Sequence, residues 1–302
     1  MTEKLTQELR KLGVQKLLCL ISRRAAGVWS LLPSLAYQNL SHLKEGGNIV
    51  LIDFGRRNEM FEHFKVAPGN IPPTVSLASL DKNNQIELIN YYKDIVLKLG
   101  DVQKLGSDYR AFVEKLELEN KKLLLCPYQT MHVYSSSMDN NDILLESSLI
   151  SIAEKYNPKL IYLTFEGQPE RPIFDKKLFE DKIMEFCLDA CDIILSLVRT
   201  DSVTRFNEGI DIPAYLAFNP KWRSKLRLFL TRHSVDIEIP KELSNFVMGT
   251  SPFFESLGQS IESGRIPWVD LKVGQYDKKH TKLISKYFEG IEQASKYVLE
   301  LN

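Results

Sequence analysis

The chain has 302 residues, the length of one large domain or two ordinary ones. Its 39 basic side chains balance its 39 acidic ones, so no net charge draws the protein onto nucleic acid or an anionic membrane. The composition is 44% hydrophobic and 26% charged, with no apolar run near the roughly 18 residues of a membrane-spanning helix, which excludes a disordered chain, a coiled coil, a fibre and an integral membrane protein.

Seven short apolar runs predict β-strands. Several are apolar throughout, as strands buried on both faces of a sheet must be. In chain order they are 15–22 (QKLLCLIS), 48–54 (NIVLIDF), 122–126 (KLLLC), 159–164 (KLIYLT), 192–198 (DIILSLV), 214–219 (AYLAFN) and 235–239 (VDIEI).

Stretches with apolar residues at helical spacing lie between these runs. They cover residues 29–43, 85–99, 102–119, 141–156, 176–190, 202–209 and 281–301, and the charged segment 1–14 predicts a further N-terminal helix. Strands that alternate with helices in this way predict an α/β fold, a doubly wound, mostly parallel sheet with helices on both faces.

Residues 66–120 interrupt the alternation. A loop rich in Pro and Ser at 66–79 leads into two helical patterns, and strand-forming runs precede and follow the whole segment. We therefore interpret 66–120 as a loop and helical insertion on a single domain that spans residues 1–302.

The four cysteines predict neither a disulfide framework nor a metal site. Cys19 and Cys126 lie inside apolar runs, where a free cysteine usually behaves as a small buried hydrophobe. Cys187 and Cys191 share a helix face, but no histidine lies near them in sequence to complete a zinc site. Because the N-terminal residues also lack the apolar core of a secretory signal, the sequence predicts a cytoplasmic protein.

In a doubly wound sheet the ligand site lies at the carboxyl ends of the strands. The turn at residues 21–31 (ISRRAAGVWSL) follows the first strand and opens a helix, the position at which a P-loop cradles phosphates. Together with 51–58 (LIDFGRRN), 189–198 (DACDIILSLV) and 214–220 (AYLAFNP), it resembles the MinD/ParA group of deviant P-loop ATPases, including its FlhG-like members. The resemblance covers residues 15–270 and implies a three-layer P-loop NTPase fold, ATP and Mg²⁺ as cofactors, and a dimer formed across bound ATP.

The first motif of that family is degenerate in this chain. Its loop S-G-K-G-G-V-G-K-S-T falls on residues 22–31, with the signature lysine on Arg24 and the phosphate-gripping lysine on Trp29, or on Val28 when counted back from the helix. The family's glycines fall on Ala25, Ala26 and Val28. No lysine occurs between Lys16 and Lys44, so the loop lacks both the glycine backbone that approaches phosphates and the charge that neutralises them. Gly27 and Ser30, whose hydroxyl matches the Mg²⁺ ligand, remain as vestigial nucleotide-binding residues.

The other two catalytic motifs are also lost. Asp53 matches the first aspartate of the family's I-D-x-D motif, but Gly55 stands where the water-positioning aspartate is expected. The aspartate of the D-T-x-x-G motif falls on Leu163, and Glu166 is the only nearby carboxylate. Three simultaneous losses predict a pseudo-ATPase, because a single unusual residue could be a variant mechanism whereas three remove phosphate, water and metal binding together.

Asn219 and the arginine pairs each have two interpretations. Asn219 follows the predicted strand 214–219 and matches an asparagine that reads adenine in the family, but Asn-Pro also commonly starts a turn. The arginine pairs at 23–24 and 56–57 follow the first two strands. They would make a basic mouth for an anion or an acidic partner, or they are solvated surface, which we favour.

The two terminal helices occupy positions at which members of the family make contacts with a membrane or a partner protein. The last helix, 281–301, matches the position of a membrane anchor in MinD, but its lysines are offset by acidic residues, so we predict that it packs on the sheet. Residues 6–12 (TQELRKL) loosely resemble the element with which FlhG proteins contact a partner GTPase, although an amphipathic turn that covers the sheet explains them equally well.

The leading hypothesis is a pseudo-ATPase that acts as a scaffold or spatial-positioning factor for a polar, pilus, flagellar or division assembly. It predicts no catalytic residues, metal or cofactor, and a protein partner that is an assembly component or a related ATPase or GTPase. A homodimer fits this hypothesis, nucleic acid does not, and membrane contact is at most indirect. The alternative is a functioning ATPase or nucleotide sensor whose ATP and Mg²⁺ site is rebuilt around Arg24, Ser30, Asp53 and Asn219. An enzyme of unrelated chemistry predicts a convergent titratable cluster that the sequence does not show.

Overall fold

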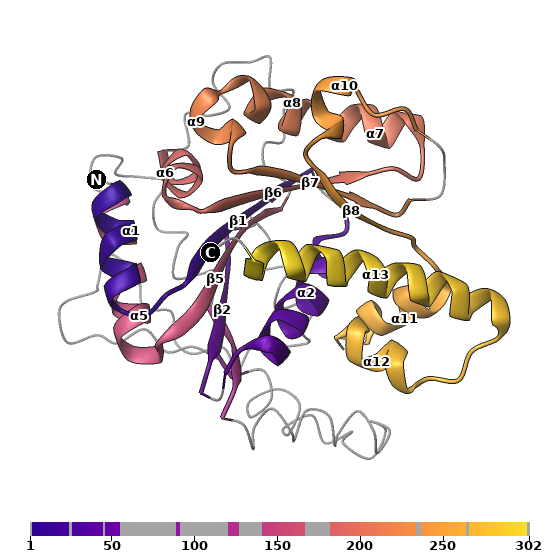
Figure 1. The fold of residues 1–302 in the computed structure, drawn as a ribbon, viewed down its shortest axis with the longest axis horizontal. Coiled ribbons are helices and arrows are strands. Elements are labelled where there is room, and N and C mark those ends of the chain that lie inside the picture. Colours follow the sequence, from indigo (N-terminus) through magenta and orange to yellow (C-terminus); the bar gives the residue numbers. More distant parts are fainter. Residues whose placement is uncertain are drawn as a thin grey trace.

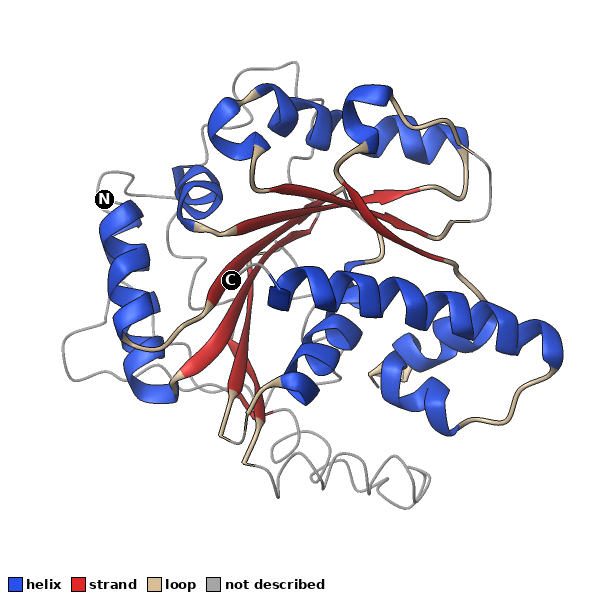
Figure 2. Ribbon diagram, viewed as in Figure 1, coloured by secondary structure: helices blue, strands red, loops and turns tan. Residues whose placement is uncertain are grey.

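One twisted β-sheet crosses the molecule and carries helices on both faces (Figures 1 and 2). The computed structural model describes residues 2–23, 26–44, 46–54, 89–90, 120–126, 141–166, 182–233, 237–263 and 266–300. Its strands are β1 (Lys16–Ser22), β2 (Asn48–Asp53), β3 (Ile89–Asn90), β4 (Lys122–Cys126), β5 (Pro158–Glu166), β6 (Ile193–Arg199), β7 (Leu226–Thr231) and β8 (Val247–Ser251).

The strand order is β3-β4-β2-β5-β1-β6-β7-β8. Every pairing from β4 to β8 is parallel, and only β3 runs antiparallel to its neighbour β4. The first strand lies between β5 and β6, so the chain winds outward from β1 in both directions and the strand order reverses there. This confirms the predicted α/β fold with a mostly parallel, doubly wound sheet.

Two layers of helices bury the alternate side chains of the strands. One face of the sheet packs against α2 (Val28–His42), α11 (Glu255–Glu262), α12 (Pro267–Val273) and α13 (Lys278–Glu300). The other face packs against α1 (Thr2–Lys11), α5 (Asn141–Tyr156), α6 (Lys182–Ala190), α7 (Val203–Gly209), α8 (Asp211–Phe218), α9 (Pro220–Arg223) and α10 (Lys241–Ser244). All four cysteines are free and buried on this second side, which confirms that Cys19 and Cys126 are core residues.

Helix α13 lies directly across β8, the last strand of the sheet. A Cβ atom at Gly290 of α13 would lie 2.1 Å from the carbonyl oxygen of Thr250, and a Cβ atom at Gly249 of β8 would lie 3.2 Å from the carbonyl oxygen of Gly290. Two glycines therefore let helix and strand backbones touch. The helix covers this part of the edge strand, which would otherwise offer unpaired backbone groups to another chain.

Most predicted elements are confirmed to within a few residues. β4 and α5 have the predicted bounds, and β1, β2, β5, β6, α1, α2, α7 and α13 differ from theirs by at most three residues at either end. α6 ends where predicted, at Ala190, but the start of its predicted range lies outside the described residues. The predicted packing of the last helix on the sheet is also confirmed, because Ile284, Tyr287 and Ile291 are buried in the core.

Three predictions of local structure were wrong. Residues 214–218 belong to helix α8 and not to a strand, because a short apolar run rich in Ala and Leu suits a buried helix as well as a strand. Residues 237–239, part of the last predicted strand, form no strand. The sheet instead ends with β7 and β8, neither of which had been predicted. Ile89–Asn90, inside the predicted helix 85–99, is strand β3. The rest of the predicted insertion 66–120, apart from Asn120, lies outside the described residues.

Candidate functional site

The turn between β1 and α2 is the centre of the candidate site. Gly27 caps α2 with φ +89°, in the left-handed region, and a Cβ atom there would lie 2.8 Å from Ser30 Oγ. Only glycine fits this position without strain. The Ser30 hydroxyl donates to the Gly27 carbonyl oxygen at 2.7 Å, and the Ser30 and Leu31 amides donate to the same oxygen at 3.1 and 3.2 Å. The hydroxyl that the resemblance assigns to Mg²⁺ therefore closes the turn on itself.

Two further side chains fix this turn from outside. The hydroxyl of Thr231, at the end of β7, donates to the carbonyl oxygen of Ala26. The phenol of Tyr287, on α13, donates to the carbonyl oxygen of Ser30 at 2.6 Å. Tyr287 is fully buried, and burial raises the pKa of its phenol well above the usual value, so the group remains a neutral donor. The turn is thus tied both to the sheet and to the C-terminal helix.

Apolar side chains of the turn and of the first residues of α2 belong to the hydrophobic core. Ala26, Val28 and Trp29 are 3%, 1% and 8% exposed, and all three pack in the cluster that α2, α11, α12 and α13 form with the sheet. Val28 and Trp29 are the two positions at which the resemblance places the phosphate-gripping lysine. Buried apolar groups here cannot neutralise phosphate charge.

Asp53, at the end of β2, is completely buried beside β5. Its Oδ1 accepts a hydrogen bond from Thr164 Oγ1 at 2.9 Å. Just beyond it, the rings of Phe54 and Phe165 stack with centroids 4.7 Å apart and planes 4° from parallel. Leu163, in place of the metal aspartate, is also buried. The surviving aspartate therefore serves a strand-to-strand contact in an apolar setting.

Arg23, the described part of the predicted basic mouth, forms an ion pair with Asp211. Arg23 Nη2 lies 2.5 Å from Asp211 Oδ2, and Arg23 Nε donates to the carbonyl oxygen of Glu208 at 3.2 Å. This pairing neutralises the Arg23 charge. Arg24, Gly55 and the pair at 56–57 lie outside the described residues.

Asn219 lies at the amino ends of the strands, whereas the turn before α2 and Asp53 lie at the carboxyl ends. It links α8 to α9, and its Oδ1 accepts the Lys221 amide at 3.0 Å as the N-cap of α9. Because 214–218 is a helix, α7 and α8 carry the chain from the carboxyl end of β6 back to the amino end of β7 (Figure 1). The structure brings Gly27, Ser30 and Asp53 to the carboxyl ends of β1 and β2, the two strands that flank β5, and separates Asn219 from them.

A second group of polar residues lies at the ends of β6 and β7 and was not predicted from the sequence. Arg199 binds both carboxylate oxygens of Asp201 at 2.6 to 2.8 Å. Thr200 Oγ1 lies 3.2 Å from His233 Nδ1, and Arg232 has φ +53°. The alternating pattern of 226–231 (LRLFLT) was the missing signal, since a strand there places residues 231–233 at the carboxyl edge.

ATP and Mg²⁺, the cofactors implied by the resemblance, do not fit the residues described at this turn. Ser30 is only 7% exposed and its hydroxyl is already bonded to the Gly27 carbonyl oxygen, while Val28 and Trp29 occupy the lysine positions in the core. Across the described ranges, no group of three or more His, Cys, Asp or Glu side chains is placed to hold a metal ion.

Comparison with solved structures shows what the chain resembles as a whole. It is similar to the MinD cell division protein from Aquifex aeolicus, with a TM-score of 0.57 and 12% identity over 95% of this chain and 98% of that one. A ParA family ATPase from Chlorobium tepidum TLS matches with a TM-score of 0.47 and 13% identity over 93% of this chain and 98% of that one. Apo McdA from Cyanthece matches with a TM-score of 0.47 and 12% identity over 92% of this chain and 98% of that one. No family model and no curated protein matches the sequence. The likeness to MinD shows that the chain has a MinD/ParA-like fold.

Proposed function

We propose that this protein is a MinD/ParA-like pseudo-ATPase that acts as a scaffold or spatial-positioning factor for a polar, pilus, flagellar or division assembly. The observation that carries the proposal is the turn before α2, which uses its own hydroxyl and carbonyl groups to close on itself and has core side chains where lysine is needed. The step from fold to assembly rests on analogy with the fold's known members.

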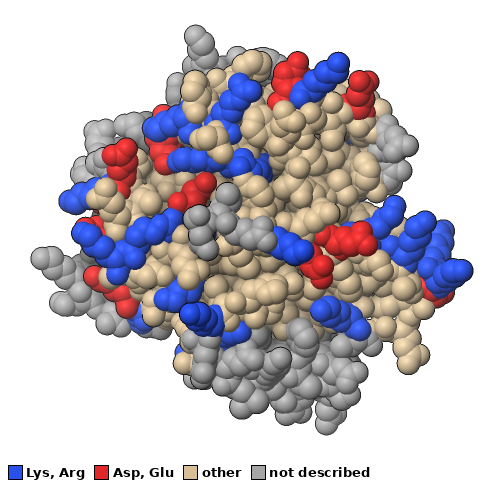
Figure 3. Space-filling view, in the orientation of Figure 1, with Lys and Arg blue, Asp and Glu red and all other residues tan. Residues whose placement is uncertain are grey.

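The proposed mode of action is binding to another protein in the cytoplasm. A homodimer, if it forms, would use contacts other than bridging ATP. On the face shown in Figure 3, basic side chains gather where α13 begins and acidic ones lie close beside them, which suits protein contacts better than a polyanion. The apolar face of α13 is packed on the sheet and is not available as an amphipathic anchor. No helix in the described ranges is long and apolar enough to cross a membrane.

Calorimetric titration with ATP and Mg²⁺, together with a phosphate-release assay, tests the loss of function. We expect neither saturable heat nor turnover. A second arm uses Trp29→Lys, which places a lysine at the position that the resemblance assigns to it. We expect that this single change does not restore hydrolysis, because Gly55 and Leu163 still replace the water-positioning and the metal-binding aspartates. Tight Mg²⁺-dependent binding with turnover by the unmodified protein would refute the proposal and favour the alternative, a nucleotide sensor with a rebuilt site.

A further inference from the structure

Arg232 occupies a fixed position between three strand ends. It follows β7, and its φ of +53° lies in the left-handed region that residues other than glycine rarely adopt. The backbone around it is held in place, because the Thr200 amide donates to the Thr231 carbonyl oxygen and the His233 amide donates to the Ser251 carbonyl oxygen, both at 2.9 Å. The fold thus holds a strained backbone that presents this one side chain at the carboxyl edge of the sheet.

The guanidinium of Arg232 has no acceptor within the described part of the chain. Its Cζ lies 4.4 Å from the ring centroid of Phe253, and its Nε is buried without a hydrogen-bond partner among the described residues. Burial, and then the nearby charge of Arg199, lower the pKa of Arg232, while Asp201 acts in the opposite direction. Both carboxylate oxygens of Asp201 accept hydrogen bonds from Arg199. Leaving such a donor unsatisfied is costly, so it calls for an explanation.

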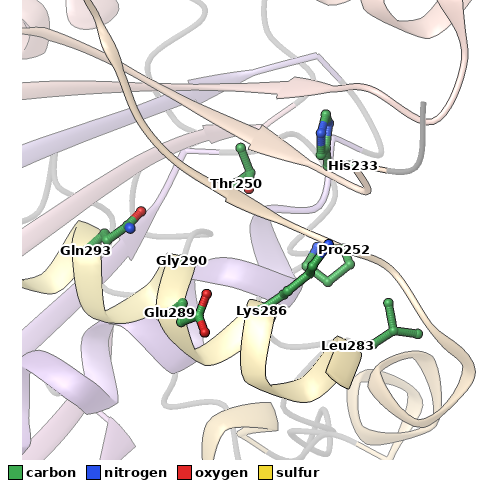
Figure 4. Close-up of a pocket in the computed structure, with 8 residues that line it drawn as sticks. All are labelled: His233, Thr250, Pro252, Leu283, Lys286, Glu289, Gly290 and Gln293. Atoms are coloured by element: carbon green, nitrogen blue, oxygen red, sulfur yellow. The ribbon is translucent and has the colours of Figure 1, made fainter. Parts of the chain in front are cut away.

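The surface next to Arg232 suits a protein contact. Phe253 is 41% exposed although it is a large aromatic side chain. His233, the next residue after Arg232, lines a cavity of about 340 Å³ between β8 and α13, into which Lys286 reaches from the helix toward Pro252 (Figure 4). Among the described residues that line this cavity, Glu289 on the same helix is the one acidic side chain. An arginine beside an exposed aromatic ring at the rim of a recess is the composition found at the centre of protein interfaces.

We propose that Arg232 and Phe253 form the docking site for an acidic segment of a partner protein. A carboxylate of that segment would accept hydrogen bonds from the Arg232 guanidinium, and its neighbours would cover the Phe253 ring. A carboxylate fits better than a phosphate because the described charges that act on one another here, Arg199, Arg232 and Asp201, leave an excess of one positive charge, which a single carboxylate balances. The proposal names the partner surface and so rests on the proposed interaction role, although it does not depend on the loss of ATP hydrolysis.

The test is a titration of the ¹⁵N-labelled full-length protein with a capped hexaglutamate peptide, followed through the arginine Nε–H signals. Arg232→Lys identifies the Arg232 signal, since this variant keeps the charge but loses that N–H. We expect the Arg232 signal to shift with the peptide, and Arg232→Gln to weaken binding by about tenfold, the effect of removing a charge-assisted pair. Arg223→Gln is the matched control, because Arg223 lies over Phe246 in the same kind of contact but precedes β7 and is therefore at the other edge of the sheet.

Three outcomes would overturn the docking site: no shift with peptide, equal binding by the two glutamine variants, or inorganic phosphate that binds at Arg232 more tightly than the peptide does. Thermal unfolding of Arg232→Lys and Arg232→Gln separates a lost site from a lost fold. The ATP titration is an independent measurement. If the protein binds neither the peptide nor ATP, the docking site is refuted and the pseudo-ATPase proposal still stands.

Discussion

Gly290→Ala tests whether α13 truly lies against the backbone of β8. The added methyl group would stand 2.1 Å from the Thr250 carbonyl oxygen and 3.1 Å from its carbonyl carbon, where ordinary contacts begin at 3.4 Å. The atoms in the way are backbone atoms of a strand, so no side-chain rotation relieves the clash. Helix and strand would have to separate by about 1.3 Å, the difference between those distances.

The magnitude follows from two opposing effects. Alanine is favoured over glycine inside a helix by about 1 kcal/mol. Overpacking of a rigid contact costs about 1–3 kcal/mol, and a backbone obstacle places this case near the upper limit. We therefore expect a net loss of about 2 kcal/mol. Because the entropy of unfolding is about 2.1 cal/mol/K per residue, a chain of this length would lose about 3 °C in Tm.

Urea unfolding followed by circular dichroism measures this loss, with Glu292→Ala as the control. Glu292 is exposed two residues further along α13, so its replacement changes helix propensity without touching the strand and should alter stability by less than about 0.5 kcal/mol. A Gly290→Ala variant as stable as the unmodified protein, or more stable, would show that the helix propensity dominates and that the backbones are not in contact.

Three further substitutions probe the turn and the strand ends. Gly27→Ala should cost about 1–3 kcal/mol of stability, because of its positive φ and because the added Cβ atom would contact Ser30 Oγ. Gly46→Ala should cost less, because Gly46 also has a positive φ, +74°, but an added Cβ atom there has no atom within 4 Å. Equal losses in urea unfolding would refute the steric contribution at Gly27. Tyr287→Phe should cost about 1–2 kcal/mol by leaving the Ser30 carbonyl oxygen without its phenol donor. Tyr276→Phe is the control and should change little, because the Tyr276 side chain is half-buried and its phenol has no hydrogen-bond partner among the described residues. A larger loss for Tyr276→Phe than for Tyr287→Phe would contradict the assigned hydrogen bond. Burial alone would raise the pKa of Asp201, but the hydrogen bonds and charge of Arg199 outweigh it and hold the pKa below its usual value. The carboxylate therefore stabilises the fold above its unfolded pKa, and that contribution is lost as the pH falls through the folded pKa. As the pH falls from about 5 to about 3, the Asp201→Asn variant should therefore lose less stability than the unmodified protein does, as measured by thermal unfolding at a series of pH values.

The amino-acid sequence determined the fold class and most of the interior. Continuous apolar runs such as those of β1 and β4 leave no polar face, so they predict strands buried on both sides, and the structure confirms them. Missing lysines in the turn before α2 could also be read directly, because no folding arrangement supplies a side chain that the chain lacks. The location of three residues could also be predicted, because Gly27 and Ser30 follow β1 and Asp53 ends β2, and both strands were predicted correctly.

Only the tertiary structure decided which polar groups meet. The apolar run 214–218 fits a helix and a strand equally well, and packing against α9 and β7 settles it as helix α8, which moves Asn219 to the far edge of the sheet. The donors that close the turn, Thr231 and Tyr287, lie 205 and 257 residues from the carbonyl oxygens they bind, beyond the reach of any local pattern. For the same reason the pairing of Arg232 with Phe253, and its lack of a described acceptor, emerged only once β7 and β8 were side by side. Local periodicity predicts most of the elements, but contacts between distant elements decide which polar groups meet at the site.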